Sequence, residues 1–158
     1  MLMEGRFTIG APIGRVWDAL FDVPSMVRWV PGVTAAHQLD ERHYQVNVEQ
    51  RVAFLTARFE ATLTLEDVAP PHHFSFTLDG KDGRIASTIK VVTSIALQEV
   101  GPDLTEIAYS NDMSVFGRLG AIGFVVIKRK AREIEEEFAR RANAALTAGA
   151  GGGSRAAV

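Results

Sequence analysis

Apolar and polar residues alternate with two different periods along this chain of 158 residues. Over residues 4–10 they alternate one by one, which predicts a first strand. A helical spacing follows Pro12, a residue that suits the first turn of a helix. Its apolar stripe consists of Ile13, Val16, Trp17, Leu20 and Phe21. A second, short helix or irregular turn is predicted over residues 24–32, where a Pro-Gly pair ends it.

Residues 33–116 return to the period of two that is typical of strands with one buried face. Such strands are predicted around residues 44–48, 58–66, 74–78, 85–95 and 107–115. Turns are predicted between them, among others at Asp-Gly-Lys-Asp-Gly, residues 79–83, and at Gly-Pro-Asp, residues 101–103. Because short turns join antiparallel neighbours, the pattern predicts a meander of about six strands with one covered face and one wet face.

A single long helix is predicted from about residue 116 to residue 146, and its length at 1.5 Å per residue is roughly 45 Å. One narrow stripe is expected to face the sheet. It comprises Gly120, Phe124, Ile127, Ala131, Ile134, Phe138, Ala142 and Ala145. In the second half of the helix the opposite side is fully polar, with Arg and Glu four residues apart, as on a solvated face.

The first half of this predicted helix is apolar on its outer side as well. The residues expected to point away from the sheet, with the basic residues that follow them, are Leu119, Ile122, Val125, Val126, Lys128 and Arg129. We expect these residues to contact a membrane surface or a partner protein, because apolar side chains next to Lys and Arg suit an anionic lipid surface. The basic residues also fit plain solvation.

Three glycines, Gly117, Gly120 and Gly123, fall within this predicted helix, where each costs about 1 kcal/mol relative to alanine. Gly120 on the sheet side either permits close packing or leaves an open cavity beneath the helix. For a cavity, the candidate ligand-binding residues are Trp29, Phe54, Phe59, Phe76, Tyr109, Met113, Phe116, Gly120 and Phe124. Ordinary core packing also accounts for each of them. The hydroxyl of Tyr109 is a candidate for fixing a ligand carbonyl, and Asn111 joins it if the twist of the strand turns it inward.

Composition narrows the classes of function. A net charge of −2, with 47% hydrophobic and 23% charged residues, gives no electrostatic reason to bind nucleic acid. The chain has no cysteine, which suits the cytoplasm and excludes thiolate chemistry. The N-terminus does not resemble a signal peptide, and the uncharged stretch of residues 119–127 is about half the length that spans a bilayer. The expected location is therefore cytoplasmic.

No catalytic constellation, cofactor site or metal site is predicted. The histidines fall in turns without the helical spacing of metal-binding pairs; they are His37, His43, His72 and His73. The glycines at a spacing of three lie in an apparent helix, so they do not form a dinucleotide-binding turn. Acidic residues of the strands alternate with apolar ones and are expected to face water, which leaves no paired acid and base.

The order of these elements resembles the START-like helix-grip fold, an α+β architecture in which a long C-terminal helix closes over a curved antiparallel sheet around an apolar cavity. Residues 5–33, GRFTIGAPIGRVWDALFDVPSMVRWVPGV, are similar to the N-terminal signature of the carbon monoxide dehydrogenase G-subunit family. The segments DVAPPHHFSFTLDGKDG, DLTEIAY and FGRLGAIG follow in that family's order. The resemblance implies one domain over residues 1–146, with about seven strands and two short helices after the first strand. Residues 147–158, rich in Ala and Gly, are predicted to be a flexible tail.

The resemblance also implies a function. In that family an accessory protein helps bring a molybdenum hydroxylase of the carbon monoxide dehydrogenase type to the membrane, by handling a hydrophobic quinone or lipid. The expectation is thus a non-catalytic binder of an apolar ligand, cytoplasmic and peripheral at the inner face of the cytoplasmic membrane. Two alternatives stay open. One is an enzyme of the START-like cyclase or hydrolase type, which needs an acid or base in the pocket, and the other is a chaperone-like assembly factor without a ligand.

Overall fold

A computed structural model describes residues 1–150 of the chain, with side chains through Thr147. The elements in chain order are β1 (Leu2–Ile9), α1 (Ile13–Phe21), α2 (Val23–Met26), the 3₁₀ turn η1 (Val27–Trp29), β2 (Val33–Gln38), β3 (His43–Val52), β4 (Leu55–Ala69), β5 (His73–Asp82), the 3₁₀ turn η2 (Gly83–Ile85), β6 (Ser87–Gly101), β7 (Leu104–Phe116), the 3₁₀ turn η3 (Gly120–Ile122) and α3 (Phe124–Ala150). The strands form one seven-stranded sheet in the order β1-β7-β6-β5-β4-β3-β2, and every pair is antiparallel.

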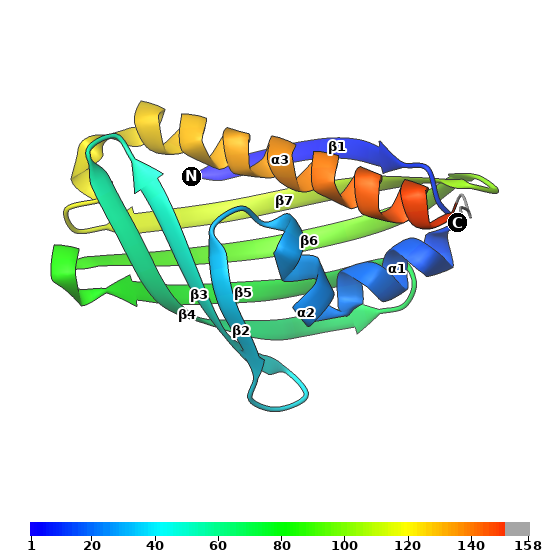
Figure 1. The fold of residues 1–158 in the computed structure, drawn as a ribbon, viewed down its shortest axis with the longest axis horizontal. Helices are drawn as coiled ribbons and strands as arrows, with labels where there is room; N and C mark the ends of the chain where they lie inside the picture. Colours follow the sequence, from blue (N-terminus) through cyan, green and yellow to red (C-terminus); the bar gives the residue numbers. More distant parts are fainter. Residues whose placement is uncertain (151–158) are drawn as a thin grey trace.

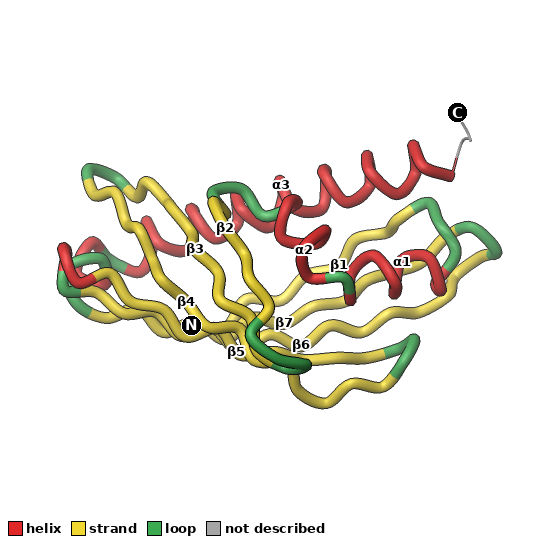
Figure 2. Tube along the Cα trace, turned by 60° about the horizontal axis from the view of Figure 1, so that its bottom comes forward, coloured by secondary structure: helices red, strands yellow, loops and turns green. Residues whose placement is uncertain are grey.

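The sheet is curved, and α3 runs along its concave side (Figure 1). Helices α1 and α2 lie on the same side of the sheet as α3 (Figure 2). α3 contacts β1, η1 and β3, so it bridges elements from both halves of the sheet. The predicted α+β helix-grip arrangement, with two short helices after the first strand and a meander of strands, is confirmed.

Strand alternation builds the core on the concave side of the sheet. The larger cluster of buried residues lies among α1, α2, the second half of α3 and the strands, and it is centred on aromatic rings. Trp17 meets Phe74 edge to face, with ring centroids 5.5 Å apart. A second, smaller cluster closes the end of the sheet at which the β3–β4 hairpin approaches the start of α3. This second cluster consists of Val52, Leu55, Ala57, Phe59, Ile85 and Leu119.

The long helix begins at Phe124, not at residue 116 as predicted. β7 continues through Phe116, and residues 117–123 form a connection that contains η3. Gly117 and Gly123 have φ values of 86° and 114°, in the region that favours glycine. A Cβ atom at Gly117 would lie 1.8 Å from the carbonyl oxygen of Ala86, so the connection also approaches another backbone segment closely. These glycines therefore serve the turn that leads into the helix and do not interrupt the helix.

The turn predicted at residues 79–83 also lies later in the chain, because β5 continues through Asp82 and η2 makes the turn. Gly80 is paired with Ala61 on one side and with Ile89 on the other. A Cβ atom at Gly80 would lie 3.1 Å from side-chain atoms of both neighbours. The first Asp-Gly pair therefore belongs to a strand, and the second one makes the turn.

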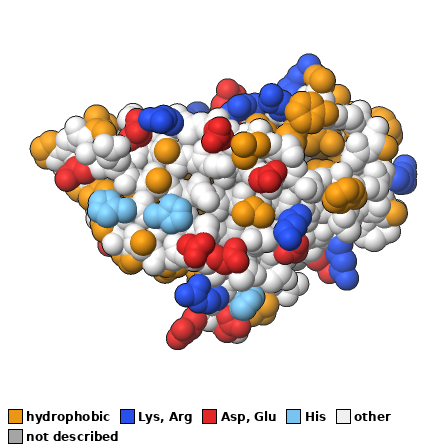
Figure 3. Space-filling view, turned by 180° about the vertical axis from the view of Figure 1, so that it is seen from behind, with side chains coloured by type: hydrophobic (Ala, Val, Ile, Leu, Met, Phe, Trp, Pro, Cys, Tyr) orange, Lys and Arg blue, Asp and Glu red, His pale blue; other side chains and the backbone are white. Residues whose placement is uncertain are grey.

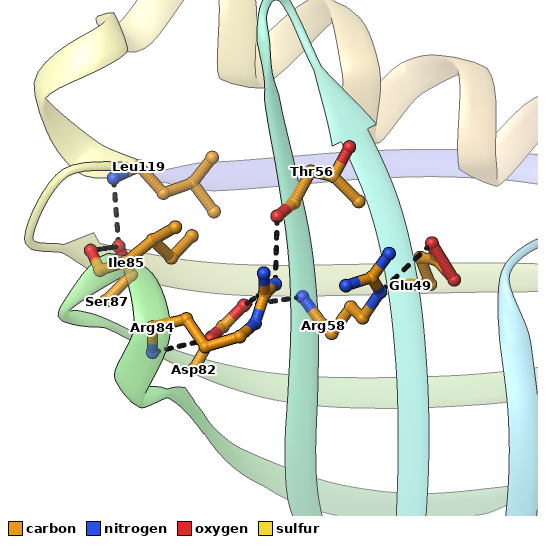
Figure 4. A network of polar contacts seen from close by, with 8 residues as sticks. All are labelled: Glu49, Thr56, Arg58, Asp82, Arg84, Ile85, Ser87 and Leu119. Atoms are coloured by element: carbon orange, nitrogen blue, oxygen red, sulfur yellow. Dashed lines mark hydrogen bonds and ion pairs between the residues drawn. The ribbon is translucent and has the colours of Figure 1, made fainter.

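Asp82 stabilises this turn from a buried position (Figure 4). Its carboxylate accepts the backbone N–H groups of Arg58, at 2.8 Å, and of Arg84, at 3.0 Å. Burial alone would raise the pKa of Asp82, but these bonds and the Arg84 guanidinium outweigh burial and hold the pKa below its usual value. Close by, the buried Ser87 hydroxyl accepts the Leu119 N–H at 2.9 Å, which ties the connection before α3 to η2 and β6.

At the other end of α3, the helix runs through Ala150, past the predicted end at residue 146. Residues 151–158 of the predicted flexible tail lie outside the described residues. Within residues 1–150, no helix combines the length and the apolar character that crossing a membrane requires.

Candidate ligand-binding cavity

A cavity lies between α3 and the concave face of the sheet. It consists of two adjoining pockets of about 170 and 260 Å³. The residues that line both pockets are Met26, Val30, Phe76, Thr93, Asn111, Ile134 and Glu135. For comparison, an apolar cavity of about 150 Å³ holds a benzene molecule. The cavity is therefore large enough for a small organic molecule or for part of a longer one.

Strand and helix periodicity determine which side chains line the cavity. Odd-numbered residues of β7 face the concave side, so Tyr109, Asn111 and Met113 reach the cavity in succession. The lining residues of α3 occupy positions i, i+3, i+4 and i+7 of one helix face. They are Ala131, Ile134, Glu135 and Phe138. The cavity thus lies under the middle of α3 and not under its start.

Most of the remaining wall is apolar. The smaller pocket is lined by, among others, Phe7, Leu20, Ile95 and Ile107. The larger pocket is lined by, among others, Val46, Val48, Phe59, Leu63 and Leu78. Each Å² of apolar surface removed from water contributes roughly 25 cal/mol, so these walls favour an apolar guest.

A chain of hydrogen bonds crosses this apolar cavity from β6 through β7 to α3. The Thr93 hydroxyl donates to Oδ1 of Asn111 at 2.7 Å, and Nδ2 of Asn111 donates to Oε2 of Glu135 at 3.0 Å. The Tyr109 hydroxyl donates to Oε1 of the same carboxylate at 2.9 Å. Arg132 also donates to Oε1, at 3.2 Å, from a side chain that is 43% exposed, whereas the Glu135 side chain is 13% exposed. The cavity therefore holds one largely buried carboxylate surrounded by donors.

Tyr109 is held in its protonated form. Burial, followed by its hydrogen bond to Glu135 and the charge of that carboxylate, raises the pKa of Tyr109 to about 12. At neutral pH the phenol is thus a donor, and its hydrogen is directed at Glu135. In this structure the hydroxyl hydrogen is engaged by Glu135, and its use to fix a ligand carbonyl stays a prediction.

The structure places four of the candidate ligand-binding residues in the cavity wall: Phe59, Phe76, Tyr109 and Met113. Asn111 faces the cavity as well, since the strand turns it inward. Trp29 is buried but does not line either pocket, and its ring meets Phe138 edge to face with centroids 5.9 Å apart. A role in ligand binding stays a prediction for all of these residues.

The other four candidates lie outside the cavity. Phe54, Phe116 and Phe124 are 78%, 65% and 59% exposed, respectively. Phe54 belongs to the tight β3–β4 turn, Phe116 is an even-numbered residue of β7 and points away from the concave side, and Phe124 is the first residue of α3. Gly120 lies in η3, where a Cβ atom would come within 2.5 Å of the carbonyl oxygen of Val115. Gly120 thus permits a close backbone contact and lines neither pocket of the cavity.

The apolar outer face predicted for the start of the helix is smaller than expected. Leu119 is 4% exposed and belongs to the second cluster, because the chain is not yet helical at this residue. Ile122 and Val126 are half-buried against the same cluster. The remaining residues of this predicted face are exposed, namely Val125, Lys128 and Arg129. Figure 3 shows apolar side chains together with Lys and Arg side chains at the upper right end of the molecule.

Glu135 is the candidate that sequence reasoning missed, together with its partners Thr93 and Arg132. A signal was present, because Glu135 lies four residues after Ala131 and hence on the helix face predicted to meet the sheet. It stands within residues 132–137, all of which except Ile134 are charged, and such a stretch is typical of a solvated face. The position of α3 on the sheet determines that Glu135 points inward while neighbouring acidic residues such as Glu136 point outward.

No curated protein matches the chain in sequence. A conserved protein from Geobacillus kaustophilus has a similar structure, with a TM-score of 0.86 at 18% identity over 93% of this chain and 95% of that chain. A START superfamily protein from Mycobacterium smegmatis gives a TM-score of 0.72 at 13% identity over 92% and 97% of the two chains. The Zhui aromatase/cyclase from Streptomyces sp. R1128 gives 0.59 at 13% identity over 90% and 93%. At these identities the likeness shows a START-like fold.

The family follows from the sequence as a whole. The model of the CoxG family, the G subunit of carbon monoxide dehydrogenase, matches residues 5–147. This match includes the N-terminal signature of residues 5–33, the strands and the residues of α3 that line the cavity. The chain therefore belongs to the carbon monoxide dehydrogenase G-subunit (CoxG) family.

Proposed function

We propose that this protein is a non-catalytic binder of an apolar small molecule, a quinone or a lipid, which it holds in the cavity beneath α3. In this proposal it acts as an accessory protein of a molybdenum hydroxylase of the carbon monoxide dehydrogenase type. The observation that carries the proposal is the largely apolar cavity of two adjoining pockets in the concave side of the sheet. The family description, which names a component of carbon monoxide dehydrogenase, supports the partner.

The chemistry of the lining residues supports binding over catalysis. Of the described residues that line the two pockets, Glu135 and Tyr109 are the only ionisable ones. A tyrosine with a pKa of about 12 is not a base at neutral pH. The remaining polar lining residues are also engaged in hydrogen bonds. Thr93 and Asn111 bond to each other, Asn111 bonds to Glu135, and the Gln50 amide donates to the carbonyl oxygen of Pro31.

The second part of the proposal is peripheral contact with the inner face of the cytoplasmic membrane. Its support is the group of exposed apolar side chains at the start of α3, Phe124 and Val125, followed by the exposed basic residues Lys128 and Arg129. The ammonium group of Lys128 lies 5.7 Å from the centroid of the Phe124 ring. Apolar side chains next to cations suit the boundary between acyl chains and anionic headgroups.

An enzyme of the cyclase type is the second candidate, and Glu135 is the observation that favours it. A carboxylate inside the cavity meets the requirement for an acid or base that a wholly apolar interior would not meet. A turnover assay with an apolar polyketide-like substrate separates the two candidates, because a binder returns the molecule unchanged. The third candidate is a chaperone-like factor without a ligand, which would use an apolar outer face at the start of α3. Leu119 does not contribute to this face, because it is buried.

Binding of decylubiquinone and of its reduced form, each followed by tryptophan fluorescence, tests the proposal. Ala131 lines the larger pocket, so Ala131→Phe should fill part of it and weaken binding at least tenfold. The matched control is Ala144→Phe, which adds the same ring at an exposed position of the same helix and should bind as the wild type does. Equal affinity of wild type and Ala131→Phe would contradict the proposed site, and native mass spectrometry of the purified protein should reveal a lipophilic mass.

A further inference from the structure

Three of the described side chains donate hydrogen bonds to the carboxylate of Glu135. Oε1 accepts from the Tyr109 hydroxyl at 2.9 Å and from Arg132 at 3.2 Å. Oε2 accepts from Asn111 alone among the described residues, at 3.0 Å. Because a carboxylate oxygen has two lone pairs, Oε2 keeps one acceptor position free.

Asn111 keeps one free donor next to that acceptor. Its amide nitrogen carries two hydrogens, of which one is directed at Glu135. Its amide oxygen accepts from the Thr93 hydroxyl at 2.7 Å. These partners fix the orientation of the amide, because a carboxylate can only accept. An open acceptor on Glu135 and an open donor on Asn111 thus lie side by side, and both residues line both pockets.

We propose that the ligand of this cavity ends in a hydroxyl group, of an alcohol or a phenol, which donates to Glu135 and accepts from Asn111. The inference rests on the proposed binding of an apolar molecule and names the chemistry of its polar end. A hydroxyl group both donates and accepts, so it completes both open positions at once. A carbonyl or ether oxygen only accepts, so it would turn its lone pairs toward the carboxylate. For a quinone, the same rule favours the reduced form, whose ring oxygens carry hydrogens.

Burial makes this choice selective. The Glu135 side chain is 13% exposed, so a guest that fills the cavity removes most of the remaining water from the carboxylate. A buried acceptor that loses water without gaining a donor is costly, which corresponds to a binding penalty of about tenfold or more. The wall of the cavity therefore accepts many apolar bodies, whereas the Glu135–Asn111 pair selects the end group.

A purely structural role of the network makes a different prediction. If the hydrogen bonds only attach α3 to β7, removing the charge of Glu135 changes the stability of the fold and leaves the preference among ligands unchanged. Ligand preference is thus the measurement that separates the two roles.

The test compares 2-naphthol with its methyl ether, 2-methoxynaphthalene, on the delipidated full chain by isothermal titration calorimetry. The two probes share one apolar body, and the ether is the more apolar, so a cavity without the polar pair would prefer the ether. We expect the wild type to bind 2-naphthol at least tenfold more tightly than the ether. Glu135→Gln should reduce this ratio to about one. The matched control Glu136→Gln removes the same charge from the next, exposed residue of α3 and should keep the wild-type ratio.

Each result separates the inference from the proposed function. Equal binding of both probes by the wild type would overturn the hydroxyl preference and leave the binding of apolar molecules standing. Binding of neither probe would overturn the proposed function itself. A preference that survives in Glu135→Gln would overturn the assignment to Glu135. Circular dichroism and thermal unfolding of each variant establish that the fold is retained.

Discussion

Gly5 and Tyr109 face each other across the β1–β7 pair, and the ring of Tyr109 occupies the space that a side chain at Gly5 would fill. A Cβ atom at Gly5 would lie 2.3 Å from the Tyr109 hydroxyl oxygen. The absence of a side chain on β1 thus allows the ring to lie over the strand and the hydroxyl to reach Glu135 on α3. A residue of the first strand therefore sets the geometry of the cavity's polar cluster.

Gly5→Ala should displace the Tyr109 ring and break its hydrogen bond to Glu135. Because burial and this bond raise the pKa of Tyr109 to about 12, the pKa should fall toward the ordinary value of 10.0. Ultraviolet titration in a Tyr44→Phe background reports Tyr109 alone, since the chain has two tyrosines. Gly14→Ala is the control, because no atom lies within 4 Å of a Cβ there. An unchanged pKa in Gly5→Ala would refute the dependence on this gap.

Asp82→Asn should destabilise the end of the sheet at which η2 turns. The variant loses charge-assisted hydrogen bonds to Arg58 and Arg84 in a buried position, at a cost of about 1–3 kcal/mol at pH 7. The pKa of Asp82 is lowered in the fold, so its contribution is complete above the unfolded value of 3.8 and is lost as the pH falls further. Urea unfolding should show that the free energies of unfolding of the wild type and Asp82→Asn differ less at pH 3 than at pH 7. Asp79→Asn, at an exposed position of β5, should show neither effect.

Ser87→Ala should loosen the connection before α3. The Ser87 hydroxyl accepts the Leu119 N–H and donates to the carbonyl oxygen of Ile85, both in buried positions. Without it the Leu119 N–H loses its partner, which costs roughly 1–3 kcal/mol. Amide hydrogen exchange at Leu119 should accelerate, whereas Ser94→Ala, at an exposed position of the same strand, should leave it unchanged. Equal exchange in both variants would mean that Ser87 does not hold the connection.

Phe124→Ala combined with Val125→Ala should weaken binding to vesicles of phosphatidylglycerol. Both side chains are more than half exposed, and transferring such side chains from water into lipid contributes enough for a loss of about tenfold or more. Co-sedimentation at low and high salt should also show weaker binding at high salt, because salt screens Lys128 and Arg129. Val92→Ala, which shortens an exposed apolar residue on β6, is the control. Full binding by the double variant would refute membrane contact at this surface.

The sequence predicted the architecture well where one periodicity persisted over a whole element. Alternation along β7 identified Tyr109 and Met113 as inward residues. All five residues of the predicted apolar stripe of α1 contact the core, three of them buried and two partly buried. The predicted start of α3 is too early because residues 116–123 are apolar apart from Arg118 and contain a glycine at every third position. A helix and a glycine-rich connection can both have this pattern. The positive φ angles of Gly117 and Gly123 distinguish the connection from a helix, but these angles cannot be inferred from a hydropathy pattern.

The candidate site was predicted only in part, for a related reason. Phe54, Phe116 and Phe124 were assigned to the cavity by their apolar character, although their positions at a turn, on the outer face of a strand and at a helix start expose them. Glu135 was missed for the opposite reason, because a charged residue in a charged run is expected to face water. Both errors have one physical origin. Residue type indicates whether burial of a side chain is favourable, but the fold can expose an apolar side chain or bury a charged one.

The pairing of β1 with β7 brings the first and the last strand of the chain together beside the cavity. During synthesis, the first strand leaves the ribosome long before residues 104–116 exist to pair with it, and the wall supplied by residues 131–138 comes later still. The cavity is therefore not yet formed in the nascent chain. The proposed ligand would thus enter a cavity whose wall is complete only after residues 131–138 have been made.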